Sequence, residues 1–302
     1  MSVHCVLTSA GRSLSLSCPA AGLLRSLLPP AITRRNMSSK RQMDHLERTA
    51  HNQRQSALYP AQVCGIINES ETVKRLRIAV HPDFNFKAGQ WVDLFIPGVE
   101  KVGGFSMCSS PGLLQREGVV ELAVKYSKHP PAHWVHTACT LGSQVAMRVG
   151  GDFYFDPSPS DPAVNLLLVA GGVGINPLYS ILSHAADLLE VSRAPMGSAH
   201  LCYSAKTTQE LLFKNSILQV CGQFPDKLSC DFHVTQQSND LETHLQSFVN
   251  RQRITAEELR AHVDPERTLC YLCGPPPMIE AISRTLRDLG LAQDRIVFEK
   301  WW

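Results

Sequence analysis

The sequence predicts two domains of different class, a small antiparallel β-barrel followed by a doubly wound parallel α/β sheet. Three observations carry this prediction. Short alternating apolar stretches recur in the first half, an apolar strand near residue 170 runs into a glycine turn and a helix, and a second strand ends at three consecutive prolines. Alternation indicates strands covered on one face, whereas strands that alternate with helices indicate a parallel sheet.

The barrel is expected over residues 58–157. Its alternating stretches are separated by turn residues, and none is followed by a long helical pattern, so βαβ units are not indicated. The expected strands are 61–67, 73–80, 90–96, 119–126 and 145–149. Pro157, Pro159 and Pro162 mark a linker, after which the second domain is expected over 163–302.

The second domain opens with the stretch around which it is organised, residues 165–177. Residues 166–170 are apolar without alternation, as in a parallel strand covered on both faces. The glycines that follow allow a ligand close to the backbone, and we expect Asn176 as the N-cap and Pro177 as the first helical residue. A helix start behind a glycine turn suits phosphate, although the third glycine of the usual fingerprint is missing and a plain connection stays an alternative.

A second strand, 268–273, runs into the prolines at 275–277 and then into a helix. Ligands of open α/β sheets bind beyond the carboxyl ends of the strands. The glycine turn and the proline corner are therefore expected on one rim, the first for phosphates and the second for the reactive end of a dinucleotide. The strand expected at 199–204 ends without an acidic residue but beside Lys206, so the choice between NAD and NADP stays open.

Taken together, the glycine turn and Cys273-Gly274-Pro275-Pro276-Pro277-Met278 resemble the pyridine-nucleotide domain of the ferredoxin–NADP reductase superfamily. The ending Phe298-Glu299-Lys300-Trp301-Trp302 resembles that family's C-terminus, and the resemblance extends from about residue 58 to the end. It implies an oxidoreductase that passes hydride from NAD(H) or NADP(H) to FAD, and electrons onward to an acceptor that the sequence does not identify.

The same resemblance assigns roles to individual residues. The segment 103–111 is similar to the family's flavin strand, which would place Phe105 against the isoalloxazine ring and the Ser106 hydroxyl near N5. Ser106, Cys273 and Glu299 are the candidate catalytic residues, with Cys273 flanking the nicotinamide. The candidate cofactor-binding residues are Phe105, Ser106, Gly171, Gly172, Val173, Gly174, Ile175, Asn176, Gly274, Pro275 and Trp302.

Two positions depart from the family pattern. Gly103 stands where the family has an arginine for the flavin phosphate, and His129-Pro130-Pro131-Ala132 stands where it has glycine-x-x-serine or threonine. Lys125, His129 and the N–H groups of residues 132–134 are the expected substitutes. The alternative is a nucleotide-binding module without flavin that serves as a sensor or assembly partner. His129, His133 and His136 would share a metal only on a helix, which the prolines interrupt, so no metal is expected.

The front of the chain is basic and free of acid. Residues 1–43 hold six of the basic residues, and Asp44 is the first acidic one. We expect a mitochondrial targeting segment at 1–40, with a secretory signal as the alternative, and a polar leader at 41–57. The net charge of +2 gives no case for nucleic acid, and no apolar run is long enough to span a membrane. The ten cysteines lack zinc or iron–sulfur spacing and favour a reducing compartment.

Overall fold

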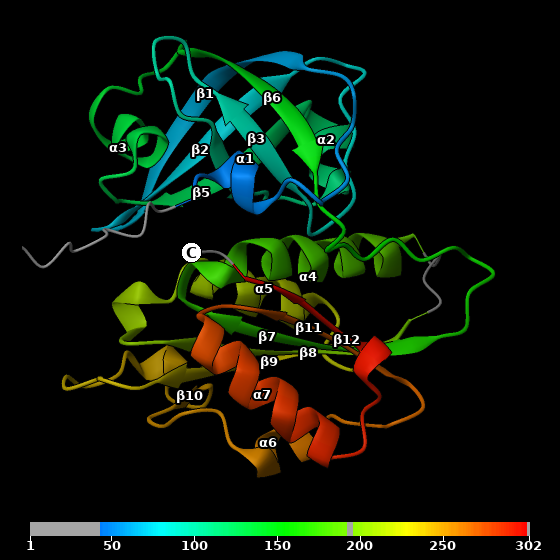
Figure 1. Cartoon of the computed structure of the whole chain (residues 1–302). Coiled ribbons are helices and arrows are strands. Elements are labelled where there is room, and N and C mark those ends of the chain that lie inside the picture. Colours follow the sequence, from blue (N-terminus) through cyan, green and yellow to red (C-terminus); the bar gives the residue numbers. More distant parts are fainter. Residues whose placement is uncertain (1–42, 192–195, 301–302) are drawn as a thin grey trace, which may run out of the picture. The chain divides into compact units, whose positions relative to one another are not determined.

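The computed structural model describes residues 43–191 and 196–300, which form two six-stranded sheets (Figure 1). The first sheet is antiparallel, with the order β4-β3-β6-β1-β2-β5. Its strands are β1 Tyr59–Ser70, β2 Val73–Val80, β3 Trp91–Phe95, β4 Gly103–Ser106, β5 Val119–Lys125 and β6 Gln144–Gly150. A bridge between Met107 and Leu122 joins the two edge strands, so the sheet closes into a barrel. The barrel therefore forms as expected from its alternating stretches.

Two short helices belong to the barrel, α2 Pro111–Glu117 and α3 Pro130–Thr137. Ser110 caps α2 with Pro111 in its first turn, and His129 stands at the N-cap of α3. The expectation that Pro130 and Pro131 interrupt a helix is wrong. Both prolines occupy the first turn of α3, where a missing N–H costs no helical hydrogen bond and the fixed φ suits the helix.

The second sheet is parallel, in the order β10-β9-β8-β7-β11-β12. Its strands are β7 Val164–Gly171, β8 Met196–Ala205, β9 Leu228–Val234, β10 Val249–Asn250, β11 Thr268–Cys273 and β12 Ile296–Glu299. Helices α4 Ile175–Glu190 and α5 Lys214–Gln223 cover one face, and α6 Ala256–Arg260 and α7 Pro276–Asp288 cover the other (Figure 1). This is the expected doubly wound arrangement, with β10 and β12 as edge strands that periodicity did not indicate.

Helix α4 lies between the barrel and the parallel sheet (Figure 1). Its Ser180 hydroxyl donates to the Ser109 carbonyl at 2.6 Å and accepts from the Gly89 N–H at 3.2 Å. The core on this side of the sheet also includes barrel residues such as Ala88 and Phe153. One continuous apolar core thus packs the barrel against α4 and the parallel sheet.

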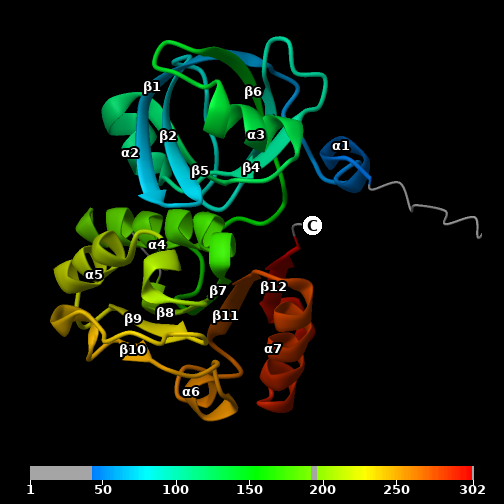
Figure 2. The ribbon, with the colours of Figure 1, turned by 90° about the vertical axis from the view of Figure 1, so that its left-hand side faces the viewer.

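The polar leader packs on the barrel. Helix α1 His45–Arg48 begins with a capping box of Asp44 and Glu47, and it lies beside β4 (Figure 2). His45 is buried, and its Nε2 lies 2.7 Å from Asp93 Oδ1. Burial alone would raise the pKa of Asp93, but hydrogen bonds from His45, Arg54 and Arg148 outweigh it and lower the pKa to about 2. Residues 43–54 therefore brace the outside of β3 and β4.

Within residues 43–191 and 196–300, no helix combines the length and the apolar character that crossing a bilayer requires. The segment expected to target the chain, 1–40, lies outside the described residues, as does Trp302.

Candidate functional site

The glycine turn and the proline corner meet at one rim, as the two motifs predict. Strands β7 and β11 are neighbours, with Ala170 paired to Cys273. A Cβ added at Gly174 would collide with the Cys273 carbonyl, and one added at Gly171 would lie 2.7 Å from Met278 Sδ. Glycine is therefore required here because the two corners touch, not only because a ligand approaches them.

Helix α4 begins directly from the turn. Residues Gly172–Gly174 form a 3-10 turn, Gly172 has a φ of +56°, and Gly174 is the N-cap of α4. The Ile175 N–H already donates to the carbonyls of Gly172 and Val173. Pro177 has no N–H, so within the first helical turn only Asn176 can offer one to a ligand. What suits a phosphate here is the small side-chain bulk of the glycine turn at the positive end of the helix.

The expectation that Asn176 caps α4 is wrong. Asn176 is the second helical residue and is buried, and its Nδ2 donates to the Ala123 carbonyl of β5 at 2.8 Å. The side chain thus fastens the start of α4 to the barrel. Pro177 is the third helical residue, where its missing N–H again costs nothing. Sequence alone could not reveal this because the partner carbonyl is distant in the chain.

Cys273 lies at the end of β11 and is fully buried beside Glu299, its partner in β12. Burial raises the pKa of the Cys273 thiol well above its ordinary value, and the charge of Glu299 raises it further. The thiol is therefore protonated at neutral pH. Cys273 can border a nicotinamide as a small apolar group with a weak S–H donor, and it does not act as a thiolate nucleophile.

Ser106 and Glu299 connect the two sheets at this rim. Ser106 ends β4 and Glu299 ends β12, which runs toward the barrel (Figure 2). The Ser106 hydroxyl donates to Glu299 Oε2 at 3.5 Å. A hydroxyl, a carboxylate and the Cys273 thiol thus converge from three strands that the sequence separates widely. Trp302, one of the expected cofactor-binding residues, lies outside the described residues.

The two faces of β4 have different surroundings. Gly104 pairs with Asp93, so its face is the outer one, and His45 occupies the space that a Cβ at Gly104 would need. Phe105 pairs with Val92 and packs against the barrel core. The Phe105 ring and Pro131 together fill the space where a side chain at Gly103 would begin. An arginine at position 103 is thus absent and its place is taken.

The start of α3 offers a phosphate little. Pro130 and Pro131 have no N–H, the His129 N–H donates to Ser127 Oγ at 3.3 Å, and the His133 N–H donates to the His129 carbonyl at 2.9 Å. Of the first turn, only Ala132 keeps an N–H that has no partner within the helix. The expectation that the N–H groups of residues 133 and 134 could substitute for the family's anchor is therefore wrong.

The two side chains named as substitutes are also poorly suited to phosphate. The pKa of His129 is lowered, first by burial and then by the nearby charge of Arg48, so the ring is neutral at pH 7. Lys125 is exposed and lies 4.0 Å from a carboxylate oxygen of Glu210. His133 Nδ1 and His136 Nε2 contact Thr137 and the Val124 carbonyl, respectively, so the three histidines do not converge.

Elsewhere in the described residues, His200, Asp231 and His262 bring ligand atoms within 4.8 Å of one another. The rings of His200 and His262 stack in parallel, 3.5 Å apart. Lone pairs of imidazole lie in the ring plane, so two stacked rings do not point at a common ion. This cluster belongs to the packing of α6 against the sheet.

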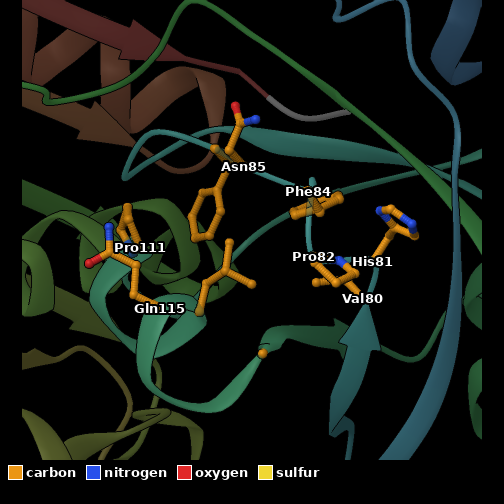
Figure 3. A pocket seen from close by; sticks show the side chains of 10 residues that line it. Val80, His81, Pro82, Phe84, Asn85, Pro111 and Gln115 are labelled. Atoms are coloured by element: carbon orange, nitrogen blue, oxygen red, sulfur yellow. The ribbon is translucent and has the colours of Figure 1, made fainter.

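A pocket of about 380 Å³ opens on the barrel, apart from the rim (Figure 3). Phe84, Pro111 and Gln115 are among its lining residues, and none of the expected site residues lines it. Its position between the end of β2 and α2 gives it no contact with the nucleotide rim.

The comparisons with known proteins agree with this geometry. A family model described as an oxidoreductase NAD-binding domain matches residues 168–284. Oxidoreductase NAD-binding domain-containing protein 1 of Danio rerio is 67% identical over 270 residues, covering 88% of this chain and all of the relative. This chain belongs to the family of oxidoreductase NAD-binding domain-containing protein 1.

The human member of this family is 54% identical over 272 residues, covering 88% of this chain and 87% of its own length. Among solved structures, a ferredoxin NADP⁺ reductase from Neisseria gonorrhoeae with bound FAD and NADP superposes with a TM-score of 0.66 at 18% identity. It covers 82% of this chain and 100% of that protein, which establishes the shared fold. The family assigns this chain to the NAD(P)H-dependent oxidoreductases, and its fold is that of the ferredoxin–NADP reductases.

Sequence reasoning found the rim but missed the support behind it. His45, Asp93, Arg54 and Arg148 were not singled out, although they hold β3 and β4 from outside. One local signal was available, because Asp44 and Glu47 have the spacing of a capping box. The buried ion network itself joins residues far apart in the sequence and leaves no local pattern.

Proposed function

We propose that this chain transfers hydride from NAD(P)H to a flavin ring held between β4 and the end of β12, and that electrons then pass to an acceptor not yet identified. The observation that carries the proposal is the approach of Ser106 to Glu299, 3.5 Å apart, at the rim that also holds Cys273 and the glycine turn. A flavin, when bound, supplies the ring nitrogen that accepts hydride.

The residues of the chain would act mainly by placement. The turn before α4 would hold the pyrophosphate of the dinucleotide, and Cys273 would border its nicotinamide without competing as a nucleophile. Ser106 would present its hydroxyl, oriented by Glu299, to the ring nitrogen. Because Asn176 fastens α4 to the barrel, the residues that would hold the flavin and those that would hold the nicotinamide belong to one packed unit, as hydride transfer by placement requires.

The residues present fit one end of FAD and not the other. Ser106 and Glu299 suit the isoalloxazine ring, which needs a hydroxyl near its nitrogen, and Phe105 beside them is an aromatic side chain that the barrel core buries only in part. The pyrophosphate end lacks an arginine at Gly103 and meets two prolines at the start of α3. This mismatch favours a second candidate function, a coenzyme-binding module that has lost flavin and serves as a sensor or assembly partner.

A mitochondrial location is part of the proposal and rests on the acid-free, arginine-bearing start of the chain. Fractionation of cells that express the untagged full-length chain, followed by protease protection of the organelles, tests it. Recovery of a shortened, protected chain with mitochondria supports the proposal. Recovery from the secretory pathway would replace it with the alternative signal.

The activity is tested on the purified full-length chain by its absorption spectrum with added flavin, under anaerobic conditions, before and after NADH or NADPH. Bleaching of the flavin band supports the reductase. A chain that binds NADH or NADPH but neither binds nor bleaches any flavin would instead establish the flavin-free module. The control is Ser106→Ala, which should retain coenzyme binding and bleach more slowly because the oriented hydroxyl is gone.

A further inference from the structure

The expected flavin site has a side for the isoalloxazine ring and a side for the phosphate-bearing tail, and the two differ in the contacts that they offer. This difference bears on which flavin the chain binds. On the ring side, Ser106 and Glu299 offer a hydroxyl and a carboxylate, and Phe105 is only partly buried where it packs on the barrel core. On the tail side, residues 103 and 129–132 would have to hold two phosphates and an adenosine. The contacts of the tail side therefore decide whether the chain binds FAD more tightly than riboflavin or FMN.

Three features weaken the phosphate contacts that the family pattern places at residues 103 and 129–132. Gly103 contributes no cation, and its side-chain space is filled by the Phe105 ring and Pro131. The first turn of α3 has lost two of its N–H groups to proline, and Ala132 supplies the one that is left. His129, at the N-cap, is neutral at pH 7 because its pKa is lowered.

We propose that the chain binds flavin through the isoalloxazine ring alone, so that the flavin is an exchangeable second substrate and not a permanently held FAD. This inference rests on the proposed function, because it names the substrate class of the same site. Riboflavin, FMN and FAD share the ring and differ only in the tail, so the chain should accept all three with similar affinity. Strong phosphate contacts are what would distinguish them, and residues 103 and 129–132 do not supply these contacts.

The reaction is balanced without a further reactant. NAD(P)H loses hydride from C4 of the nicotinamide and becomes NAD(P)⁺, and the hydride forms the N5–H bond of the flavin. One proton from solvent completes the two-electron reduction. Reduced flavin then leaves, because no tail contact retains it, and carries the electron pair to an acceptor outside the chain.

The test is equilibrium dialysis of the full-length chain against riboflavin, FMN and FAD, each with and without NAD⁺. We expect the three dissociation constants to agree within about threefold, and gel filtration to remove the flavin. An FAD affinity more than about a hundredfold above that of riboflavin, or FAD that survives gel filtration, would overturn the inference but leave the proposed function standing. A chain that binds NAD⁺ but none of the three flavins would overturn both.

A variant with the family's phosphate-binding residues allows the flavin preferences of two chains to be compared, whatever the affinity of each chain for flavin. The triple variant Gly103→Arg, His129→Gly, Ala132→Ser restores the family pattern at these positions, and the arginine requires both the Phe105 ring and Pro131 to shift. We expect FAD and FMN to gain at least about tenfold over riboflavin. Leu141→Arg, which adds the same charge at an exposed barrel position, is the control and should change no flavin preference. If the triple variant folds and shows no gain, the tail site does not decide flavin choice.

Discussion

Helices α3 and α4 begin differently, although the resemblance places a phosphate in front of each. Helix α4 follows a glycine turn, with Gly172 at a positive φ and Gly174 at the N-cap. Helix α3 starts with Pro130 and Pro131, which complete the helix geometry but remove the donors that an anion needs. The two helix starts thus differ in what they can offer a phosphate, so helix position alone does not identify a binding site.

The buried network around Asp93 supports β3 and β4 of the barrel, and its loss should have the largest effect on stability. Asp93→Asn removes the charge that His45, Arg54 and Arg148 share, so we expect unfolding free energy to fall by about 3 kcal/mol. Flavin binding should weaken because β4 pairs with β3, whereas NADH binding by the folded fraction should not change. Urea unfolding and calorimetric titration measure both.

The matched control is Asp83→Asn, at an exposed barrel carboxylate that lies 3.6 Å from His81. It should leave stability and both ligands unchanged, since exposed ion pairs contribute little. If Asp93→Asn lowered NADH affinity as much as flavin affinity, the two helix starts would not be independent sites.

The coenzyme side is best disturbed at Gly174, whose added side chain would meet the Cys273 carbonyl. Gly174→Val should push the glycine turn away from β11 and reduce NADH affinity about 10- to 100-fold, in line with the ~1–3 kcal/mol cost of overpacking. Flavin binding at β4 should change much less. Fluorescence titration of NADH provides the measurement.

Gly222→Ala serves as the control for that substitution. Gly222 lies within α5 with open space around it, so alanine should stabilise the helix by about 0.5–1 kcal/mol and leave NADH affinity as it was. Equal NADH affinity in Gly174→Val and the unchanged chain would show that the two corners need not touch.

The parallel-sheet domain and the barrel should lose stability at different pH values as the solution is acidified. Burial, followed by the charge of His200, lowers the pKa of His262 to about 4. The unfolded chain takes up this proton first as the pH falls from about 6.5, so the contribution of neutral His262 is lost between about 6.5 and 4. Asp93 has its pKa lowered to about 2 from 3.8, so the barrel loses its contribution later, between these two values.

The size of the His262 effect is modest because its ring is only half-buried. We expect about 1 kcal/mol of stability to be lost between pH 7 and 5, after allowance for solvent screening. Urea unfolding at the two pH values measures it, with His262→Asn as the variant that should lack this loss. A loss of the same size in both chains would assign the acid sensitivity to another group.

The sequence was informative where the signal is local or repeated. Alternation located five of the six barrel strands, and the family resemblance supplied β4. The glycine turn with the proline corner located the rim, because strand ends of a parallel sheet meet on one side. It failed where a side chain finds its partner far along the chain, as Asn176 does with the Ala123 carbonyl and His45 with Asp93. At α3 it failed for another reason, since proline ends a helix from inside but is well suited to begin one.

The smallest expected effect concerns the choice between NADH and NADPH at the rim of the parallel sheet. Lys206 is exposed just after β8, at the end of the sheet where the ribose of a dinucleotide is read. Lys206→Glu should weaken NADPH binding by about tenfold, because a carboxylate repels the 2′-phosphate, and should leave NADH binding nearly unchanged.

The control is Lys227→Glu, which makes the same charge change beside the start of β9, at the other end of the strands, and should affect the binding of neither coenzyme. If both variants weakened NADPH equally, the effect would come from net charge, and Lys206 would have no place in the coenzyme site. A loss of NADPH affinity in Lys206→Glu alone would show that the rim of the parallel sheet recognises the 2′-phosphate through a nearby cation. The start of α3 has no such cation at Gly103.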